Sequence, residues 1–140
     1  MTSDIPPLEF EYYDTPFSSP AITENNGHTA NIQLPKPKSY NSELWQIYDK
    51  YSPHVTGGPL PYGRRFVAES VHFHWGSKDA HGSEHVVDGQ RFSMEMHIVH
   101  RNSKYRSVEE AREHEDGLAV LSVLYQVKVS FFFSFIDFGQ

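Results

Sequence analysis

The chain of 140 residues contains no cysteine, and this absence excludes three kinds of protein at once. Without thiols there is no disulfide framework, no zinc finger with cysteine ligands and no cysteine nucleophile. Basic residues are also few, because 12 lysines and arginines stand against 18 acidic residues and give a formal net charge of −6. This balance argues against a nucleic-acid partner, which needs a basic surface to neutralise its phosphates.

Long apolar runs are scarce as well. The one membrane-like stretch covers residues 117–136. Lys128 near its middle would cost roughly 2.5–3.5 kcal/mol on insertion into a bilayer. The first half of this stretch is rich in β-branched residues, which favours a buried strand over a membrane span. The N-terminus shows neither the basic region nor the apolar run of a secretory signal, so we expect a cytoplasmic protein.

The composition is otherwise that of a soluble globular chain. Hydrophobic residues make up 38% of the sequence and charged residues 21%, which argues against wholesale disorder. The length corresponds to one domain or less, since domains hold about 100–200 residues. Nine of the 140 residues are histidines, and imidazole is the commonest metal ligand among side chains. The histidines are therefore the first place to look for function.

Periodicity predicts a mostly β protein with short helices. Polar and apolar residues alternate at 66–75 and again at 92–100, as in half-buried strands. The continuous apolar run at 118–127 predicts a central strand. The sequence SVEE from Ser107 has the spacing of a capping box and predicts a short helix to about Glu115. A weaker helical pattern lies at 43–48.

Two histidines on one predicted strand indicate a metal site. His72 and His74 alternate along the strand, so both side chains project from one face, with Cα atoms about 6.6–6.8 Å apart. If a neighbouring strand brings His97 alongside, three imidazoles can bind one Zn²⁺ and leave a fourth tetrahedral position open, as catalytic zinc sites do. Glu95 shares a face with His97, and its carboxylate can accept the N–H of a ligating imidazole.

The spacing alone leaves an ordinary alternative open. Paired histidines on a strand are more often surface residues or hydrogen-bonded core residues than ligands. The other histidines fall in predicted loops or on opposite strand faces, where we expect a structural or solvated role; they include His54, His81, His85, His100 and His114.

Segments around these residues resemble the α-class carbonic anhydrases. The matching blocks are NNGH at 25–28, VHFHWGS at 71–77, GSEH at 82–85, MEMHIVH at 94–100 and DGLAVL at 116–121. They occur in the family's order and cover roughly residues 8–127. The resemblance implies a mainly β, α+β fold, with part of a twisted, mostly antiparallel central sheet and short peripheral helices.

The resemblance also implies an activity, the reversible hydration of CO2 to bicarbonate and a proton, in which zinc hydroxide attacks the carbon of CO2. The cofactor is then Zn²⁺, with His72, His74 and His97 as ligands. Glu95 matches the carboxylate behind the third ligand, and Glu84 matches a buried glutamate that orients a threonine hydroxyl. Carbon dioxide and bicarbonate are the expected partners, with no nucleic acid and no membrane.

Further residues match the walls of the family's active site. His28 matches the proton shuttle, a role for which an imidazole pKa near 6.5 is well suited. Asn26 and Asn31 match the hydrophilic wall, and Val99 and Val120 match the apolar wall where CO2 rests. Each match has an ordinary alternative, because the valines suit a plain core and His28 suits a solvated loop.

The sequence also departs from the family pattern. Ser70 stands where the family usually has a glutamine that is hydrogen-bonded to the first ligand. The chain ends about halfway through the family domain, before the segment that supplies the threonine. We therefore expect a partial domain at 1–127, incomplete relative to the family, and a divergent Phe-rich tail at 128–140.

Three alternatives follow for function. The chain is a carbonic anhydrase whose activity depends on the missing parts, a catalytically inactive zinc-binding or protein-interaction fragment, or a product that does not fold stably. Intact zinc ligands disfavour a member that evolved without catalysis. Exposed strand edges and the tail also predict self-association.

Overall fold

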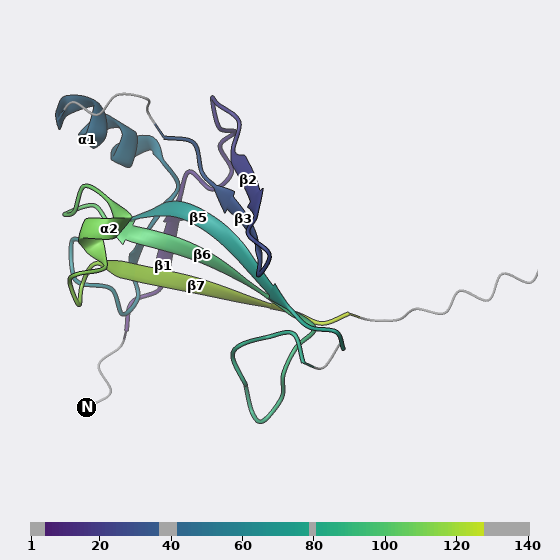
Figure 1. Cartoon of the computed structure of the whole chain (residues 1–140). Helices are drawn as coiled ribbons and strands as arrows, with labels where there is room; N and C mark the ends of the chain where they lie inside the picture. Colours follow the sequence, from purple (N-terminus) through teal and green to yellow (C-terminus); the bar gives the residue numbers. More distant parts are fainter. Residues whose placement is uncertain (1–4, 37–41, 79–80, 128–140) are drawn as a thin grey trace, which may run out of the picture.

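The described part of the chain folds around one antiparallel sheet (Figure 1). The structure is a computed structural model that describes residues 5–36, 42–78 and 81–127. Its strands are β1 (Leu8–Glu11), β2 (Ile22–Asn25), β3 (Ala30–Gln33), β4 (His54–Gly57), β5 (Phe66–Trp75), β6 (Met94–Asn102) and β7 (Leu118–Tyr125), and its helices are α1 (Ser42–Tyr51) and α2 (Val108–Ala111). The expected fold, mainly β with a mostly antiparallel sheet and short helices, is confirmed. The tail predicted at 128–140 lies outside the described residues.

The long strand β5 organises the sheet. Along one edge it pairs with β6, and along the other it pairs first with β4 and then with β3. Strand β7 pairs with β6, while β1 and β2 extend the sheet from β4 and β3. The alternation at 66–75 predicted β5 with its bounds, and β6 begins two residues later than predicted. Both functional histidine segments therefore lie on adjacent central strands.

The register gathers the polar positions of three strands on one face. His72 of β5 lies opposite His97 of β6, which lies opposite Ser122 of β7. Directly opposed residues in antiparallel strands project to the same face. On the other side of β5, Asn31 of β3 continues this row. The row crosses the sheet at the level of the predicted metal site.

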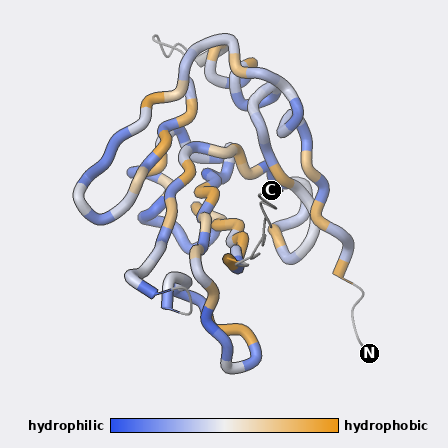
Figure 2. The backbone as a smooth tube through the Cα atoms, turned by 90° about the vertical axis from the view of Figure 1, so that its right-hand side faces the viewer, coloured by the Kyte–Doolittle hydropathy of each residue, from blue (hydrophilic) through white to orange (hydrophobic). Residues whose placement is uncertain are grey.

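The opposite face of the same three strands is apolar. Its rows are Val71–Ile98–Leu121, Phe73–Met96–Val123 and Trp75–Met94–Tyr125. All nine side chains are at least partly exposed, and Trp75 is 55% exposed. Figure 2 shows that hydrophobic and hydrophilic residues follow one another in short segments along the described backbone. The self-association expected from such surfaces stays a prediction.

Strand β7 differs from the expectation of a central strand. Within the described part of the chain it pairs with β6 alone, and Val120 is 51% exposed. An apolar run shows that both faces of a strand suit burial, but it does not show which segment covers them. The strand itself was predicted correctly, whereas its place in the sheet was not.

The helices are short and begin as their sequences predict. The Ser107 hydroxyl accepts the Glu110 N–H at 3.1 Å, which is the expected N-cap of α2. The helix ends at Ala111 and not near Glu115, because the chain after it continues as tighter turns, in one of which the His114 N–H donates to the Ala111 carbonyl at 3.0 Å. Helix α1 is longer than the predicted fragment. No helix within the described ranges has the length and apolar character to cross a membrane.

A buried ionic network joins α1 to the sheet at the end opposite the polar row. Arg101 of β6 is 0% exposed and donates from Nη2 to Asp49 of α1 at 2.7 Å and from Nε to Glu69 of β5 at 2.5 Å. Its Nη1 also donates to the Tyr105 carbonyl at 2.5 Å, and its guanidinium lies 4.2 Å from the centroid of the Trp45 ring. Because all three nitrogens of the guanidinium donate hydrogen bonds, Arg101 fixes the position of α1 on the sheet.

His100 on β6 is held as a neutral imidazole inside the protein. Its Nδ1 donates to the Ile98 carbonyl at 2.8 Å, and its Nε2 accepts from the Tyr13 hydroxyl. Burial lowers the pKa of His100 to about 4 and raises the pKa of Tyr13 to about 12. The imidazole is 0% exposed, so charging it requires breaking its contact with Tyr13.

We expect this histidine to make the fold sensitive to acid. The folded chain binds a proton at His100 less readily than the unfolded chain, whose histidine pKa is about 6.5, so stability is lost as pH falls from about 6.5 toward 4. Between about pH 7 and pH 5 the loss is about 2 kcal/mol. Urea unfolding at the two pH values measures it. In His100→Gln the decline should be clearly smaller, and an equal decline in both proteins would contradict the assignment.

Candidate metal centre

Three imidazoles converge on the polar face of β5 and β6. The ring centroids of His72 and His97 lie 5.1 Å apart, those of His74 and His97 4.7 Å, and those of His72 and His74 5.1 Å. One nitrogen from each ring lies within 4.8 Å of the others. The alternation of β5 supplies two of the rings, and the β5–β6 register supplies the third. The structure thus brings together the three histidines that the sequence predicted as ligands.

The spacing of the rings fits a tetrahedral zinc ion. Zinc–nitrogen bonds of about 2.0–2.1 Å at tetrahedral angles place two ligand nitrogens about 3.3–3.4 Å apart. The Nδ1 of His97 and the Nε2 of His72 are 3.3 Å apart. This distance also suits a weak hydrogen bond between the two imidazoles. His74 favours the metal site over the hydrogen bond, because its buried Nε2 has no hydrogen-bond partner.

A buried imidazole nitrogen without a hydrogen-bond partner is costly, and a metal ion bound to it and to the two neighbouring imidazoles would remove that cost. Three imidazoles also form a donor set that suits Zn²⁺. Burial, followed by the neighbouring rings of His74 and His97, lowers the pKa of His72. A lowered pKa keeps this imidazole neutral, and only the neutral form binds a metal. The residues present therefore fit a zinc ion.

Glu95 selects the nitrogen that His97 offers. Its carboxylate is 0% exposed and accepts from His97 Nε2 at 2.6 Å, which leaves Nδ1 of that ring free as the donor. The backbone N–H groups of Glu84 and His85 donate to its other oxygen, each at 2.8 Å. Although burial opposes ionisation, these bonds and one from Ser122 hold the pKa of Glu95 far below its usual value. Glu95 is therefore ionised and held in place.

A second group of possible ligands fails the same test of distance. Nitrogens of His85 and His97 lie close to the Glu95 carboxylate. The Glu95 oxygen is only 2.6 Å from His97 Nε2, whereas two ligands of one tetrahedral ion need about 3.3 Å. The group is thus a hydrogen-bonded cluster that supports His97. The described residues supply one triad of convergent donors with metal-ligand spacing, formed by His72, His74 and His97.

Glu84 lies where the sequence did not predict it. The expected buried carboxylate is 57% exposed, with Oε1 3.4 Å from His74 Nδ1 and Oε2 3.9 Å from His97 Nδ1. Local contacts set this position. The Glu84 N–H donates to Glu95, and the Glu84 carboxylate turns toward the two imidazoles. The expectation of burial is therefore corrected, and the role of Glu84 as an orienting group stays a prediction.

The turn that carries His28 is fastened beside the histidines. The Asn26 side-chain oxygen accepts the N–H groups of His28 and Thr29 at 3.0 and 2.9 Å, which makes a tight turn. The Thr29 hydroxyl bonds both the N–H and the carbonyl of Phe73, the residue between His72 and His74. His28 is exposed. Asn31 lies opposite His72, so this one of the two asparagines predicted for the hydrophilic wall lies beside the site, and the role of that wall stays a prediction.

The two valines predicted for the apolar wall lie side by side. Val99 of β6 is directly opposite Val120 of β7, on the face that carries the histidines. The half-exposed side chain of Val120 leaves this apolar surface open to water in the described part of the chain. Ser70, which stands in the place of the expected glutamine, lies opposite Val99 on the same face as His72.

Two residues support Glu95: Ser122, which sequence reasoning missed, and His85, for which it expected only a structural or solvated role. The Ser122 hydroxyl and the His85 Nδ1 both donate to the Glu95 oxygen that also binds His97. Ser122 is the single polar residue between Leu118 and Leu124, which is the signal that could have found it. His85 gave no such signal, because its contact depends on how the loop 76–93 returns to β6.

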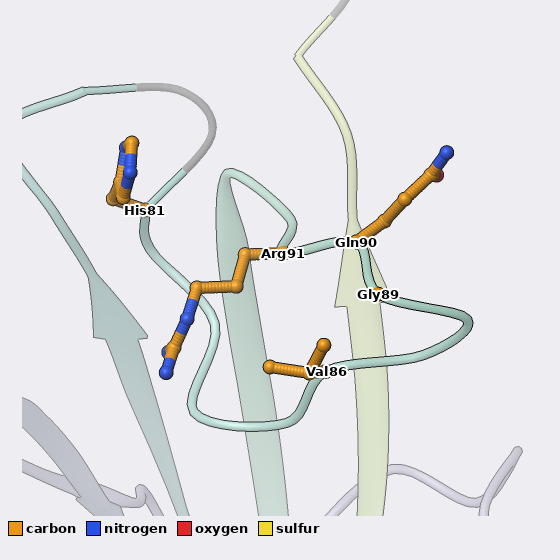
Figure 3. A pocket seen from close by; sticks show the side chains of 5 residues that line it. All are labelled: His81, Val86, Gly89, Gln90 and Arg91. Atoms are coloured by element: carbon orange, nitrogen blue, oxygen red, sulfur yellow. The ribbon is translucent and has the colours of Figure 1, made fainter.

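A separate cavity of about 530 Å³ lies in that loop, away from the histidine triad. It is lined by His81, Val86, Gly89, Gln90 and Arg91 (Figure 3). The side chains drawn in Figure 3 point in different directions and do not converge on a common centre. Arg91 is also occupied, since Nη1 donates to the Ser83 carbonyl at 2.6 Å. The cavity adds no ligand to the metal centre.

Comparison with known proteins agrees with the geometry. The chain is 40% identical over 118 residues to carbonic anhydrase 15 of Mus musculus, which covers 84% of this chain and 33% of that protein. It is 43% identical to carbonic anhydrase 6 of Bos taurus, with 74% and 28% covered. Carbonic anhydrase 3 of Bos taurus is 51% identical, with 74% and 34% covered. The chain thus spans about a third of the length of these relatives.

The sequence model of one family matches almost the whole chain. Residues 1–134 match the family described as eukaryotic-type carbonic anhydrase. The matched region includes both strands that carry the histidine triad, together with Glu84, Glu95 and the turn at His28. Because the match covers far more than half of the 140 residues and the triad has the spacing of zinc ligands, the chain belongs to the eukaryotic-type carbonic anhydrase family.

Proposed function

We propose that the chain binds one Zn²⁺ through His72, His74 and His97 and hydrates CO2 at that site. The observation that carries the proposal is the convergence of three imidazoles, with a 3.3 Å separation between His97 Nδ1 and His72 Nε2. The zinc ion supplies a Lewis acid, which in the carbonic anhydrases is the established means of making water nucleophilic near neutral pH. The protein supplies the position, the charge and the route for the proton.

Each supporting residue has a physical task. The Glu95 carboxylate keeps the proton of His97 on Nε2 and so keeps Nδ1 turned toward the metal. Exposed His28, on a turn that the Thr29 hydroxyl ties to Phe73, relays protons between the site and the buffer, because an imidazole can both accept and donate a proton. Val99 and Val120 offer CO2 a small nonpolar surface on the same face as the histidines.

Zinc binding without catalysis is the second candidate function. The half-exposed Val120 favours it, because the apolar surface beside the site is open to water. Glu84 favours it too, since its carboxylate faces two imidazoles and not a hydroxyl group. In this form the chain is a zinc-binding fragment with the family's ligands but little hydration activity.

Stopped-flow CO2 hydration distinguishes these candidates. The purified chain is loaded with one equivalent of zinc and compared with a chelator-treated sample and with His72→Ala. We expect a zinc-dependent rate above both controls. Stoichiometric zinc without such a rate would support the inactive fragment. A folded chain that binds no zinc would refute both candidates.

A further inference from the structure

The carboxylate of Glu84 is turned toward the metal centre. Its Oε2 lies 3.9 Å from His97 Nδ1, and its Oε1 lies 3.4 Å from His74 Nδ1. Of the described residues, these two imidazoles are the ones that its oxygens approach as ion-pair partners. A carboxylate in this place is within a short movement of any ion that the three histidines hold.

The movement required is small and involves the side chain alone. Ligand atoms on a tetrahedral zinc ion lie about 3.3 Å apart, so Oε2 needs to approach His97 Nδ1 by about 0.6 Å. The main chain at Glu84 is held, because its N–H donates to Glu95 at 2.8 Å and the next N–H does the same. The side chain is 57% exposed, so it has room to rotate on its water-facing side.

The charges favour the same movement. Three neutral imidazoles leave the full double charge of a zinc ion uncompensated within the triad. Glu95 is ionised, but its carboxylate is directed to the outer nitrogen of His97 and is fully engaged by hydrogen bonds. The Glu84 carboxylate is exposed and lies 3.9 Å from Nδ1 of His97, the nitrogen that is directed at the metal. Oxygen from a carboxylate is an ordinary zinc ligand at about 2.0–2.2 Å.

We propose that Glu84 is the fourth metal donor of this chain and closes the site that His72, His74 and His97 form. The inference rests on the proposed zinc binding and adds that the bound zinc has no position left for water. A site with four protein donors has the form of a structural zinc site, whereas a catalytic site keeps one position for water. Hydration of CO2 then requires the Glu84 carboxylate to swing away first.

The test compares Glu84→Gln with the wild-type chain and with Glu113→Gln, which removes the same charge from an exposed site elsewhere. Zinc affinity is measured by competition with a chromophoric chelator. Each protein is then loaded with Co²⁺ and titrated with azide, and the visible spectrum reports when the anion enters the metal's coordination sphere. Circular dichroism confirms that the three proteins share one fold.

We expect Glu84→Gln to bind zinc at least about 10-fold more weakly and to bind azide at least about 10-fold more tightly, because a donor is lost and a position opens. Glu113→Gln should match the wild type in both. Weaker zinc with unchanged azide binding would overturn the inference, since Glu84 would then act by orienting His74. If Glu84→Gln changes neither the zinc affinity nor the azide affinity of the Co²⁺ form, the inference is overturned as well. A wild-type chain that binds neither metal would refute the proposed function itself.

Discussion

Replacing Arg101 with alanine is expected to lower the free energy of unfolding by about 3–5 kcal/mol, the cost of leaving buried charges without their partner. Arg101 is the shared partner of Asp49 and Glu69, and both carboxylates are buried. Without the guanidinium, Asp49 must be neutralised or hydrated inside the protein, whereas Glu69 retains its ion pair with the partly exposed Lys36. Domains are stable by only about 5–15 kcal/mol, so the loss is a large part of the total.

Urea unfolding followed by circular dichroism measures this change. The matched control is the triple variant Arg101→Met, Asp49→Asn and Glu69→Gln, which removes all three charges and keeps similar volumes. We expect the triple variant to regain much of the lost stability, because replacing a whole buried ion network is often close to neutral. A loss below about 1 kcal/mol in Arg101→Ala would show that water enters the network and contradict its burial.

The network also shows where sequence reasoning reaches its limit. Alternation predicted β5 and β6 and the shared face of His72 and His74, because a pleated strand imposes a period of two on every side chain. Glu69 breaks this period, since the register between β5 and β6 shifts between Ala68 and Ser70. A bulge of this kind depends on the pairing of distant strands, so no local pattern announces the Glu69–Arg101 pair.

The metal centre could likewise be predicted only in part from the sequence. The resemblance assigned His97 as the third ligand and Glu95 as its partner, and the strand register brings both into place. Glu84 was placed wrongly, because a matching motif carries over a residue's identity but not the partner toward which its side chain turns. In this chain the partners near Glu84 are imidazoles, and its exposure follows from them. The strand positions of the histidine ligands were thus predictable, whereas the contacts of Glu84 in the loop were not.

His97→Ala is expected to abolish stoichiometric zinc binding. The substitution removes one of three donors, and it also leaves the ionised Glu95 without the hydrogen bond from Nε2. Loss of an outer partner of a zinc ligand typically costs about 10–100-fold in affinity, and loss of the ligand itself costs more. Zinc content after gel filtration, together with competition by a chromophoric chelator, measures the effect.

His81→Ala is the matched control, because His81 is an exposed histidine that lines the separate loop cavity. It should bind zinc as the wild type does. If His97→Ala keeps one tightly bound zinc, the ion is held elsewhere and the triad is not the metal centre. Loss of zinc in His97→Ala alone would mean that the β5–β6 register, which sets His97 opposite His72, is the structural feature that creates the site. The activity of the chain would then depend on whether Glu84 or a water molecule takes the fourth position on the zinc ion.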